Sequence, residues 1–590
     1  MKFLIISRAR LATLMSLAAV CASTALVAAC GGSGSGATTT PPATTTTPAP
    51  TELSVVAPKV DCSTLAGIDV TDIGGAGSSI TSAAVTTVTI NGTATQFCAV
   101  KGTLAPSNTF EVALPVSTWT QRFAALGCGG LCGNLSDPSQ PSSFGVSYGC
   151  PLVQQAGFVT AATDMGHQGN APTWTTDPQK QADFAYRGQH ITTLAAKKLI
   201  QAYYGQAQKY AYFVGCSDGG REALMAAQRY PADYNGIVAG APAAHFQIQN
   251  SLFHGWSVMS QSTTGDSTGN VTLYADKVKV MHKAVLAACA GQSGAADGLI
   301  ADPRTCNFDP ASIQCPANAT DTSACLTAAE VVTAGKIYGG PVDATTGQRI
   351  LAGSPQPGSE INWIGVEVPS TNSTDPAVPV TSGLFSYLIV TGAYNLIFPN
   401  TPPTIDAFGY TDASFYANAL QTNHPLNDAT DPDLSAFNAA GGKLILWHGW
   451  ADQHISPLFT IAYYEAMQNT MTAATVDKFA RLYLLPGVAH CGGGEGPASI
   501  DLVSQITGWV EKANAPEAVT TVLTDSSSAV TATRPVYPYP AVAKFSGTGD
   551  WHDAANWVKG SALYNAPTRS WAGASFYAPY TPKTQGVAAP

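Results

Sequence analysis

The sequence predicts an α/β protein with one large insertion, and three observations support that prediction. In the first and last parts of the chain, apolar stretches of strand length alternate with helical patterns, as in a doubly wound parallel sheet. The alternation breaks between residues 246 and 433, where cysteine-bounded loops and long stretches of Pro, Ser, Thr and Asn replace it. The chain of 590 residues is also too long for one compact core. We therefore expect a sheet domain made of residues 56–245 and 434–590, with residues 246–433 inserted as a lid domain.

The first 55 residues are expected to precede this fold. Three cations come before an uncharged stretch that ends at Ala29, as in a bacterial export signal, and residues 27–30 read Val-Ala-Ala-Cys, which resembles a lipobox. We therefore expect residues 1–29 to be a lipoprotein signal peptide and Cys30 to be lipidated, with a plain signal peptide as the alternative. Residues 30–55 are rich in Gly, Ser, Thr and Pro and should form a flexible tether.

Composition narrows the classes of partner and of location. Charged residues make up 11% of the chain, the formal net charge is −10, and no basic patch stands out, so we expect no nucleic-acid partner. Membrane contact is expected only through the lipid on Cys30, for an exported protein at the outer membrane or cell surface. A periplasmic or secreted protein is the alternative. The sequence leaves the oligomeric state open.

The elements of the first sheet segment follow one another in order. Residues 123–126 form an apolar strand that ends in a glycine cluster, residues 157–164 form a second strand, and residues 190–202 have a helical pattern. Strand-like residues 210–214 come next, and residues 235–240 supply a further strand. Together these stretches fill in a parallel sheet with helical connections.

The strand at 210–214 runs directly into Gly-Cys-Ser-Asp-Gly at 215–219, and helix-forming residues follow from Arg221. This order of strand, Gly-x-Ser-x-Gly turn and helix is typical of a nucleophile elbow, in which a tight turn presents the serine hydroxyl to a base. Ser217 is therefore the candidate nucleophile. A tight turn with a purely structural role is the alternative interpretation.

A serine nucleophile on such a fold needs an aspartate and then a histidine later in the chain. Two late apolar strands, each followed by a Gly-containing turn, lead to Asp452 and to His490. The rival bases are His454, which is awkwardly placed only two residues past Asp452, and His448, which we expect to line the pocket. The sequence thus predicts a catalytic set of Ser217, Asp452 and His490 on an α/β-hydrolase core.

Two backbone N–H groups are needed to stabilise the charge that develops on the attacked carbonyl oxygen. One is expected from Asp218, which follows the nucleophile. The other should come from the glycine cluster after the strand at 123–126, where Gly129 is the first choice and Gly130 lies next to it. A flexible surface loop is the alternative interpretation of that cluster.

The motifs around these residues resemble those of the tannase and feruloyl esterase family. The resemblance depends on Gly-Cys-Ser-Asp-Gly-Gly-Arg at 215–221, Gly-Ala-Pro-Ala at 240–243, His-Gly-Trp-Ala-Asp at 448–452 and Pro-Gly-Val-Ala-His-Cys at 486–491. It implies a secreted serine esterase with an α/β-hydrolase core, a large lid domain and aromatic acyl groups as substrates. No cofactor is implied for the reaction itself.

The resemblance also implies how most of the cysteines pair. Export makes disulfides the expected state, and the implied bridges are Cys62–Cys98, Cys216–Cys491, Cys289–Cys306 and Cys315–Cys325. The second of these would tie the nucleophile to the histidine. Cys128, Cys132 and Cys150 remain, and the sequence does not decide which two of them pair.

Relatives bind calcium in an aspartate-rich loop between two cysteines of the lid. Here Ala290 and Ser293 stand where the family has two of its aspartates, and Asp297 keeps its carboxylate, with Asp302 nearby. Calcium prefers six to eight oxygen ligands, roughly, with several carboxylates. A calcium site at Asp297 is therefore doubtful, and we expect a disulfide-held loop without metal.

Substrate choice should depend on the lid. Relatives that hydrolyse terephthalate half-esters use an arginine from the later lid to hold a free carboxylate, whereas Arg304 and Arg349 are the lid's only arginines here and both lie early. We therefore expect neutral phenolic esters such as gallate or ferulate esters, with His448, Trp363 and Phe385 as candidate substrate-binding residues. Packing in the core is the alternative for the two aromatic rings. The alternatives are terephthalate half-esters, other small esters, or a catalytically silent surface-binding lipoprotein.

Overall fold

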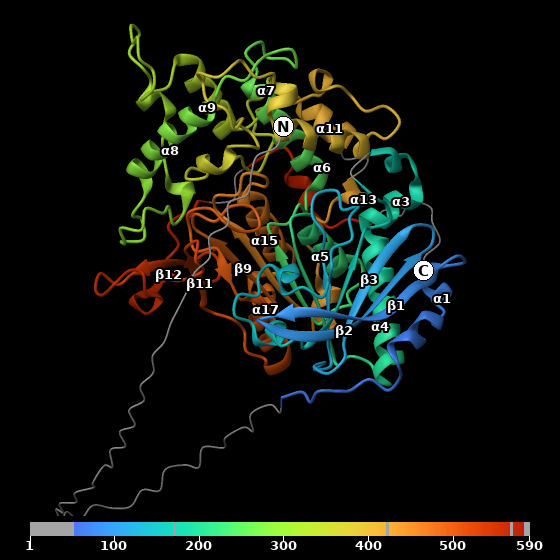
Figure 1. The fold of residues 1–590 in the computed structure, drawn as a ribbon. Coiled ribbons are helices and arrows are strands. Elements are labelled where there is room, and N and C mark those ends of the chain that lie inside the picture. The colour runs from blue at the N-terminus through green and yellow to red at the C-terminus, as the bar shows by residue number, and fades with distance from the viewer. Residues whose placement is uncertain (1–51, 170–171, 421–423, 567–569, 583–590) are drawn as a thin grey trace, which may run out of the picture. The chain divides into compact units, whose positions relative to one another are not determined.

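The computed structural model describes residues 52–169, 172–420, 424–566 and 570–582 (Figure 1). The expected signal peptide, the expected lipidation site at Cys30 and most of the expected tether lie outside the described residues. Within those ranges, no helix combines the length and the apolar character needed to cross a membrane.

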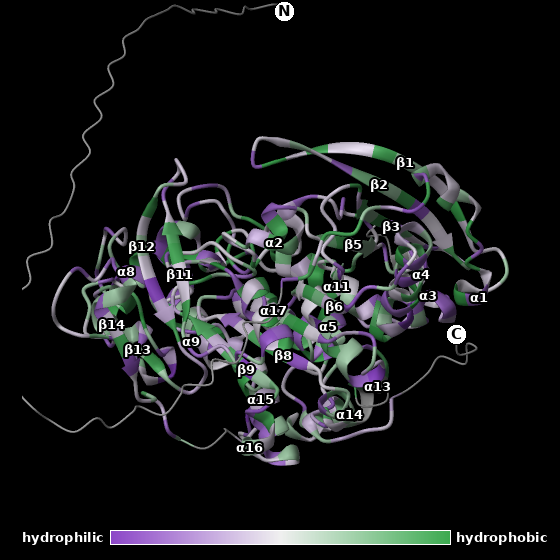
Figure 2. Ribbon diagram, turned by 90° about the horizontal axis from the view of Figure 1, so that it is seen from below, coloured by the Kyte–Doolittle hydropathy of each residue, from purple (hydrophilic) through white to green (hydrophobic). Residues whose placement is uncertain are grey.

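A nine-stranded sheet runs through the sheet domain in the order β1-β2-β3-β5-β4-β6-β7-β8-β9. The strands from β5 to β9 in this order are parallel, and β1, β2 and β3 add an antiparallel edge. Their bounds are β1 Ser79–Ile90, β2 Thr93–Leu104, β3 Asn108–Pro115, β4 Arg122–Leu126, β5 Phe158–Thr163, β6 Tyr210–Cys216, β7 Gly236–Gly240, β8 Lys443–Gly449 and β9 Ala480–Leu485. The predicted α/β class and parallel strands are confirmed. The antiparallel hairpin of β1 and β2, which extends along one edge in Figure 2, was not expected.

Helices cover both faces of this sheet because its strands are apolar on both sides. In β6, Phe213 belongs to the core that α4 and α5 cover, whereas Tyr212 and Val214 belong to the core that α17 covers. The helices of this domain are α1 Thr71–Gly74, α2 Pro151–Gln154, α3 Pro178–Ala182, α4 Gly188–Tyr204, α5 Asp218–Arg229, α14 Ser435–Ala439, α15 Pro457–Met471, α16 Ala473–Val476 and α17 Leu502–Lys512. This arrangement is the doubly wound sheet that the sequence predicts.

The described residues between 246 and 433, which we call the lid, contribute no strand to any sheet. Its helices stand over one end of the main sheet in Figure 1. They are α6 Phe246–Ile248, α7 His254–Gln261, α8 Ala275–Cys289, α9 Ala328–Gly339, α10 Val380–Gly383, α11 Phe385–Ile397, α12 Ala413–Phe415 and α13 His424–Asn427. The lid has its own apolar core around α8 and α9, in which Trp363 is fully buried.

The chain after β9 forms two small sheets beside the lid. One contains β10 Ser499–Ile500, β11 Val519–Thr524 and β12 Val530–Val536, and the other contains β13 Val542–Phe545 and β14 Trp557–Gly560. Phe545 of β13 donates its backbone N–H to the carbonyl of Ser293 in the lid, at 2.8 Å. The C-terminal sheets therefore connect the sheet domain to the cysteine-bounded loop of the lid.

Candidate active site

Ser217 occupies the sharp turn between β6 and α5, with φ of 64° and ψ of −122°. This conformation is costly for a residue with a side chain and is typical of a nucleophile elbow. The neighbouring glycines are needed because the backbones approach closely. A Cβ on Gly215 would lie 2.4 Å from the carbonyl oxygen of Gly219, and a Cβ on Gly219 would lie 2.9 Å from that of Cys128. The sequence Gly-x-Ser-x-Gly therefore fits this turn for steric reasons.

Asp452 and His490 come from the turns that follow β8 and β9, and the structure brings them into contact. Nδ1 of His490 lies 2.7 Å from Oδ2 of the fully buried Asp452. The other carboxylate oxygen, Oδ1, accepts the backbone N–H groups of His454 and Ile455 at 2.7 and 2.8 Å. Burial alone would raise the pKa of Asp452. The charge of His490 and the hydrogen bonds that Asp452 accepts outweigh burial and hold the pKa of Asp452 well below the usual range. Asp452 is therefore a rigidly held carboxylate beside the imidazole.

His448 has a different place from the one that the sequence led us to expect. Its side chain is fully buried behind Asp452 and does not line the cavity. Its Nε2 lies 3.0 Å from Oδ2 of Asp452, and its Nδ1 lies 2.8 Å from the hydroxyl of Thr460. The expectation that His448 contacts the substrate is therefore wrong, because β8 directs this side chain into the core. His448 is instead a second imidazole partner of Asp452.

His454, the other rival base, lies against the ring of His490, with the ring centroids 5.0 Å apart. Its backbone N–H, and not its imidazole, contacts Asp452. Burial, together with the charge of His490, lowers the pKa of His454 to about 4. His454 therefore faces the cavity as a neutral imidazole, and His490 is the base candidate that Asp452 orients.

The structure contains the four disulfides that the family resemblance implies, namely Cys62–Cys98, Cys216–Cys491, Cys289–Cys306 and Cys315–Cys325. Cys216 precedes Ser217 and Cys491 follows His490, so their bridge joins the two turns of the site. The structure also contains a fifth bridge, Cys128–Cys132. Among the described residues, Cys150 remains as a buried free thiol. The pairing that the sequence left open is thereby assigned.

The fifth bridge closes the glycine loop that we expect to supply an N–H group to the oxyanion. This loop lies against the turn of Ser217. The contact is so close that a Cβ on Gly127 would be only 2.5 Å from the Cα of Gly219. Gly129 lines the same cavity as Ser217 and has open space where a Cβ would stand. Asp218 is the first residue of α5, so its backbone N–H has no partner within the helix. Both expected donors therefore lie at the cavity that Ser217 lines, and their role stays a prediction.

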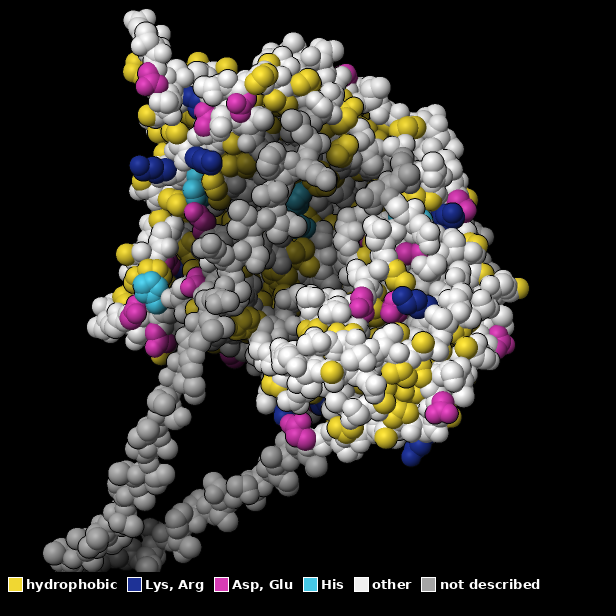
Figure 3. Space-filling model, in the orientation of Figure 1, with side chains coloured by type: hydrophobic (Ala, Val, Ile, Leu, Met, Phe, Trp, Pro, Cys, Tyr) yellow, Lys and Arg dark blue, Asp and Glu magenta, His cyan; other side chains and the backbone are white. Residues whose placement is uncertain are grey.

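A cavity of about 700 Å³ contains Ser217 and His490. The space-filling view shows a hollow between the lid and the sheet, with histidine side chains inside it (Figure 3). Its floor comes from the sheet domain and its roof from the lid, chiefly from α11. The residues that line it are Gly129, Gly130, Leu131, Cys132, Asn134, Ser217, Asp218, Ala243, Phe246, Gln249, Asn250, His254, Phe385, Leu388, Ile389, Thr391, Gly392, Ala393, Asn395, His454, Ile455 and His490.

Of the two aromatic candidates in the lid, the structure places only Phe385 at this cavity, where its side chain is 49% exposed. Trp363 is buried in the separate lid core and donates its indole N–H to Ser359. The expectation that Trp363 binds substrate is therefore wrong. Its aromatic ring gave no signal of which surface it would face, since that depends on tertiary packing.

Sequence reasoning missed the polar residues that line the lid side of the cavity. Asn250 and His254 are spaced four apart along the helical stretch that leads into α7, and Asn395 lies on α11. His254 is buried, its Nδ1 lies 3.0 Å from the hydroxyl of Ser386, and its Nε2 has no hydrogen-bond partner among the described residues. The four-residue spacing, which places side chains on one helix face, was the available signal.

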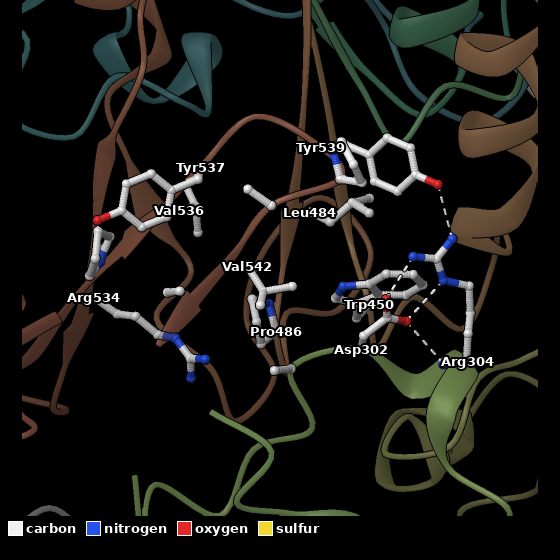
Figure 4. A pocket seen from close by; sticks show the side chains of 15 residues that line it. Asp302, Arg304, Trp450, Leu484, Pro486, Arg534, Val536, Tyr537, Tyr539 and Val542 are labelled. Atoms are coloured by element: carbon white, nitrogen blue, oxygen red, sulfur yellow. Dashed lines mark hydrogen bonds and ion pairs between the residues drawn. The ribbon is translucent and has the colours of Figure 1, made fainter. Parts of the chain in front are cut away.

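The two arginines of the lid do not line this cavity. Arg304 lies in a different small pocket, where its guanidinium pairs with Asp302 at 2.6 Å and contacts the hydroxyl of Tyr539 at 3.1 Å (Figure 4). Arg349 donates to the backbone carbonyl of Gly339. Among the described residues that line the active-site cavity, the only formal charge besides histidine is on Asp218, which pairs with Arg221 at 2.6 Å. The cavity thus offers no Lys or Arg side chain to a negatively charged substrate.

The doubtful calcium ligand, Asp297, has a protein partner in the structure. Its carboxylate forms a buried ion pair with Arg534 of β12, and its Oδ1 accepts the backbone N–H of Leu299 at 3.1 Å. Arg534 also lies over the ring of Trp557, 4.4 Å from its centroid. A guanidinium therefore satisfies the charge that Asp297 would otherwise bring to a metal.

Comparison with known proteins shows that the chain is similar to proteins named as esterases and as an ester-cleaving hydrolase. A mono(2-hydroxyethyl) terephthalate hydrolase from Piscinibacter sakaiensis is 31% identical over 498 residues, which cover 76% of this chain and 81% of that protein. A probable feruloyl esterase B-1 from Aspergillus flavus is 31% identical over 483 residues, covering 78% and 85% of the two chains. An uncharacterized esterase of Xanthomonas campestris pv. campestris is 32% identical over 529 residues, covering 80% and 87%.

Solved structures give the same result for the fold. The crystal structure of an esterase from Aspergillus oryzae superposes with a TM-score of 0.70 at 26% identity and covers 84% of this chain and 99% of its own. Feruloyl esterase B from the same organism has a TM-score of 0.71 at 24% identity, covering 85% and 100%. These similarities confirm the predicted α/β-hydrolase fold. The family model for tannase and feruloyl esterase matches residues 91–559, and the chain therefore belongs to this family of carboxylic ester hydrolases.

Proposed function

We propose that the protein is an exported serine esterase that cleaves neutral aromatic esters through an acyl-enzyme. The observation that carries this proposal is the shared cavity of Ser217 and His490, with His490 held at 2.7 Å by the buried Asp452. A nucleophile, a base and a carboxylate that orients the base are the parts that serine hydrolysis needs.

In the proposed reaction, His490 takes the hydroxyl proton of Ser217 as the serine oxygen attacks the ester carbonyl. Asp452 stabilises the imidazolium that forms, because its carboxylate contacts Nδ1 of His490. The backbone N–H groups of Asp218 and Gly129 stabilise the oxyanion. His490 then returns the proton to the leaving alcohol, and a water molecule hydrolyses the acyl-enzyme by the same steps in reverse.

The preference for a neutral acyl group follows from the lining of the cavity. It contains Phe385, Leu388 and Ile389 for an aromatic ring and Asn, Gln and His side chains for phenolic hydroxyls. A free acyl carboxylate would find no Lys or Arg among the lining residues, and burying an unpaired charge is unfavourable. Gallate and ferulate esters fit these properties, and the relative named as a probable feruloyl esterase B-1 supports this choice.

A second candidate substrate is a terephthalate half-ester, because a relative of similar identity is named as a mono(2-hydroxyethyl) terephthalate hydrolase. The lack of a cation at the cavity disfavours it. Loss of catalysis in a surface-binding lipoprotein is disfavoured by the intact contact between His490 and Asp452.

Export and lipidation at Cys30 are part of the same proposal. The five disulfides among the described residues support an oxidising compartment. Labelling with a radioactive fatty acid should mark the wild-type chain and not the Cys30→Ser variant, and the processed protein should appear in the outer-membrane fraction. Processed wild-type protein that takes up no label, or that remains in the cytoplasm, would contradict this part.

The hydrolytic proposal is tested with purified protein and three substrates: methyl ferulate, methyl gallate and a short-chain nitrophenyl ester. We expect release of the free acid from at least one aromatic methyl ester, and an acyl adduct on Ser217 when the reaction is quenched early and analysed by mass spectrometry. Ser217→Ala should retain the circular dichroism spectrum and lose turnover. Full turnover in this variant would show that another residue is the nucleophile.

A further inference from the structure

A second cluster of chemically reactive side chains lies outside the active-site cavity, where α6 meets α13 (Figure 1). His245 immediately precedes α6, His424 begins α13, and Asp428 directly follows α13. Their possible ligand atoms all lie within 4.8 Å of one another, and all three side chains are buried. Two imidazoles and one carboxylate are thus held together in the interior without a role in the proposed reaction.

His245 has no hydrogen-bond partner at either ring nitrogen among the described residues, although it is only 1% exposed. Aromatic rings surround it, and those of Phe576 and Tyr577 lie 4.9 and 5.3 Å from its ring centroid. A buried polar group without a partner is unfavourable and rare, so it requires an explanation. Nε2 of His245 lies 4.0 Å from Oδ2 of Asp428, and this distance is too long for a hydrogen bond. An ion placed between these two atoms would contact each at about 2 Å, the usual metal–ligand distance.

The other two side chains are already arranged as ligands with supporting contacts. Nδ1 of His424 lies 2.8 Å from Oδ2 of Asp428, and its Nε2 faces the hydroxyl of Thr430 at 3.5 Å. The second carboxylate oxygen of Asp428 accepts the backbone N–H of Gln247 at 2.9 Å. Contacts of this kind orient metal-binding histidines and carboxylates in proteins. On binding, the ion would replace the proton between His424 and Asp428, and that proton would leave to solvent.

We propose that His245, His424 and Asp428 form a structural binding site for Zn²⁺. Two imidazole nitrogens and one carboxylate oxygen suit zinc better than calcium or magnesium, which prefer oxygen ligands throughout. Burial of the site excludes substrate and makes a structural role the appropriate one. The guanidinium of Arg221 contacts the backbone carbonyl of Asn427, which precedes Asp428, but its charge is matched by Asp218.

The site also explains how the C-terminal segment is held. The hydroxyl of Tyr580 donates to the backbone carbonyl of Asp428 at 2.7 Å, and that of Thr430 donates to the carbonyl of Phe576 at 2.8 Å. An ion that fixes Asp428 therefore also fixes the segment from Phe576 to Tyr580 over the core. We expect bound zinc to stabilise the folded chain by mass action, since the unfolded chain lacks the assembled site.

The test uses protein expressed with added zinc, and neither of its readouts depends on ester hydrolysis. Metal content is measured by plasma mass spectrometry, and melting temperature is measured before and after chelation, with and without added zinc chloride. His245→Phe keeps a ring in the aromatic surroundings, and Asp428→Asn keeps the side-chain shape, so both variants should fold. His552→Gln changes an exposed histidine and is the matched control.

Wild type and His552→Gln should carry about one zinc per chain, and zinc should raise the melting temperature of the stripped proteins by several degrees, roughly. His245→Phe and Asp428→Asn should hold less than about a tenth of that zinc and should not respond to it. Wild-type protein that holds no zinc and does not respond to it overturns the proposal. Unchanged zinc content in both variants overturns it as well, because the ion would then bind elsewhere, for example at His454 and His490.

Discussion

Cys216 and Cys491, whose Cα atoms lie 5.9 Å apart, join the turn of the candidate nucleophile to the turn of the candidate base. Each cysteine is the immediate neighbour of a reacting residue, Ser217 or His490. The bridge therefore fixes the distance between the two groups that exchange a proton in the proposed reaction.

Removing this bridge should reduce activity before it reduces folding. In the double variant Cys216→Ser and Cys491→Ser, the turn of His490 is freed, and a displacement of about 1 Å can cost on the order of a hundredfold in rate. We expect kcat/KM on an aromatic methyl ester to fall by about that factor. The double variant Cys315→Ser and Cys325→Ser removes a bridge of the lid and should retain the rate. Equal losses in both double variants would contradict a local role for the first bridge.

The second imidazole partner of Asp452 gives another prediction. His448→Phe removes the contact at 3.0 Å to Oδ2 and leaves the backbone donors to Oδ1 in place. Asp452 should then orient His490 less well, and we expect kcat to fall by about tenfold with KM nearly unchanged. His448→Gln, which can still donate to Asp452, should recover most of the rate. If both variants raise KM instead, His448 acts on substrate binding and this interpretation is wrong.

The lid contacts the loop after His490 through an ionisable cluster that should respond to pH. His282 of α8 lies 2.6 Å from Glu360 and 2.8 Å from Glu495. Burial by itself lowers the pKa of His282, but the hydrogen bonds and charges of the two glutamates outweigh it and raise the pKa to about 9. Because the folded-state pKa exceeds the unfolded value of about 6.5, this contribution is complete below pH 6.5 and is lost as the pH rises through about 9.

We therefore expect the free energy of unfolding to decline between about pH 6.5 and 9, by at most about 1.4 kcal/mol per pH unit from this one group. Chemical denaturation at several pH values measures it. In His282→Gln, the free energy of unfolding should decline less across this window. At the alkaline end of the window, it should differ little from that of wild type. A wild-type stability that rises across the same window, with no difference in the variant, would refute the assignment.

The preference for neutral over negatively charged substrates should depend on the residues that line the cavity. Wild type should cleave methyl ferulate with a higher kcat/KM than mono(2-hydroxyethyl) terephthalate, because no Lys or Arg lines the cavity. Asn395→Arg places a cation on α11 at the cavity and should raise the relative efficiency on the half-ester by about tenfold, or about 1.4 kcal/mol. Asn395→Gln controls for the change in size. A wild-type preference for the half-ester would show that the lining has been misinterpreted.

The ion pair of Asp297 and Arg534 predicts the response to calcium. Since a buried guanidinium already pairs with this carboxylate, added calcium should neither bind beside Asp297 nor raise the melting temperature. Arg534→Gln leaves a buried carboxylate unpaired and should destabilise the fold by about 3–5 kcal/mol. Isothermal titration and chemical denaturation measure the two effects. Stoichiometric calcium binding beside Asp297 in wild-type protein would contradict the first expectation.

The sequence predicts best those features that depend on residues close together in the chain. The elbow at Ser217 and the turns of Asp452 and His490 are local patterns, in which a strand leads directly to the functional residue. Parallel pairing of β6, β7, β8 and β9 then places these turns at the same end of the sheet. The strand bounds were correspondingly close, since β6 extends only two residues beyond the predicted 210–214.

Features that depend on the direction of single side chains could not be predicted in this way. His448 and Trp363 have the residue types of a substrate pocket, yet packing turns both into a core. The bridge between Cys128 and Cys132 was undecided because three thiols were available and spacing does not select among them. The ion pair of Arg534 and Asp297 joins residues that are far apart in the sequence, so no local sequence pattern predicts it.

Gly127 and Gly219 approach each other so closely that neither can accept a side chain, whereas positions on the lid side of the cavity can. Any side chain at either glycine would collide with backbone, so neither position can change alone. On the other side of the cavity, a Cβ at Gly392 of α11 would meet only Leu131 at 3.5 Å, and Leu388 is 62% exposed. Substrate range can therefore diverge by substitutions on α11 while the chemistry of the elbow is inherited unchanged. A mutant library intended to alter specificity should accordingly be confined to that helix.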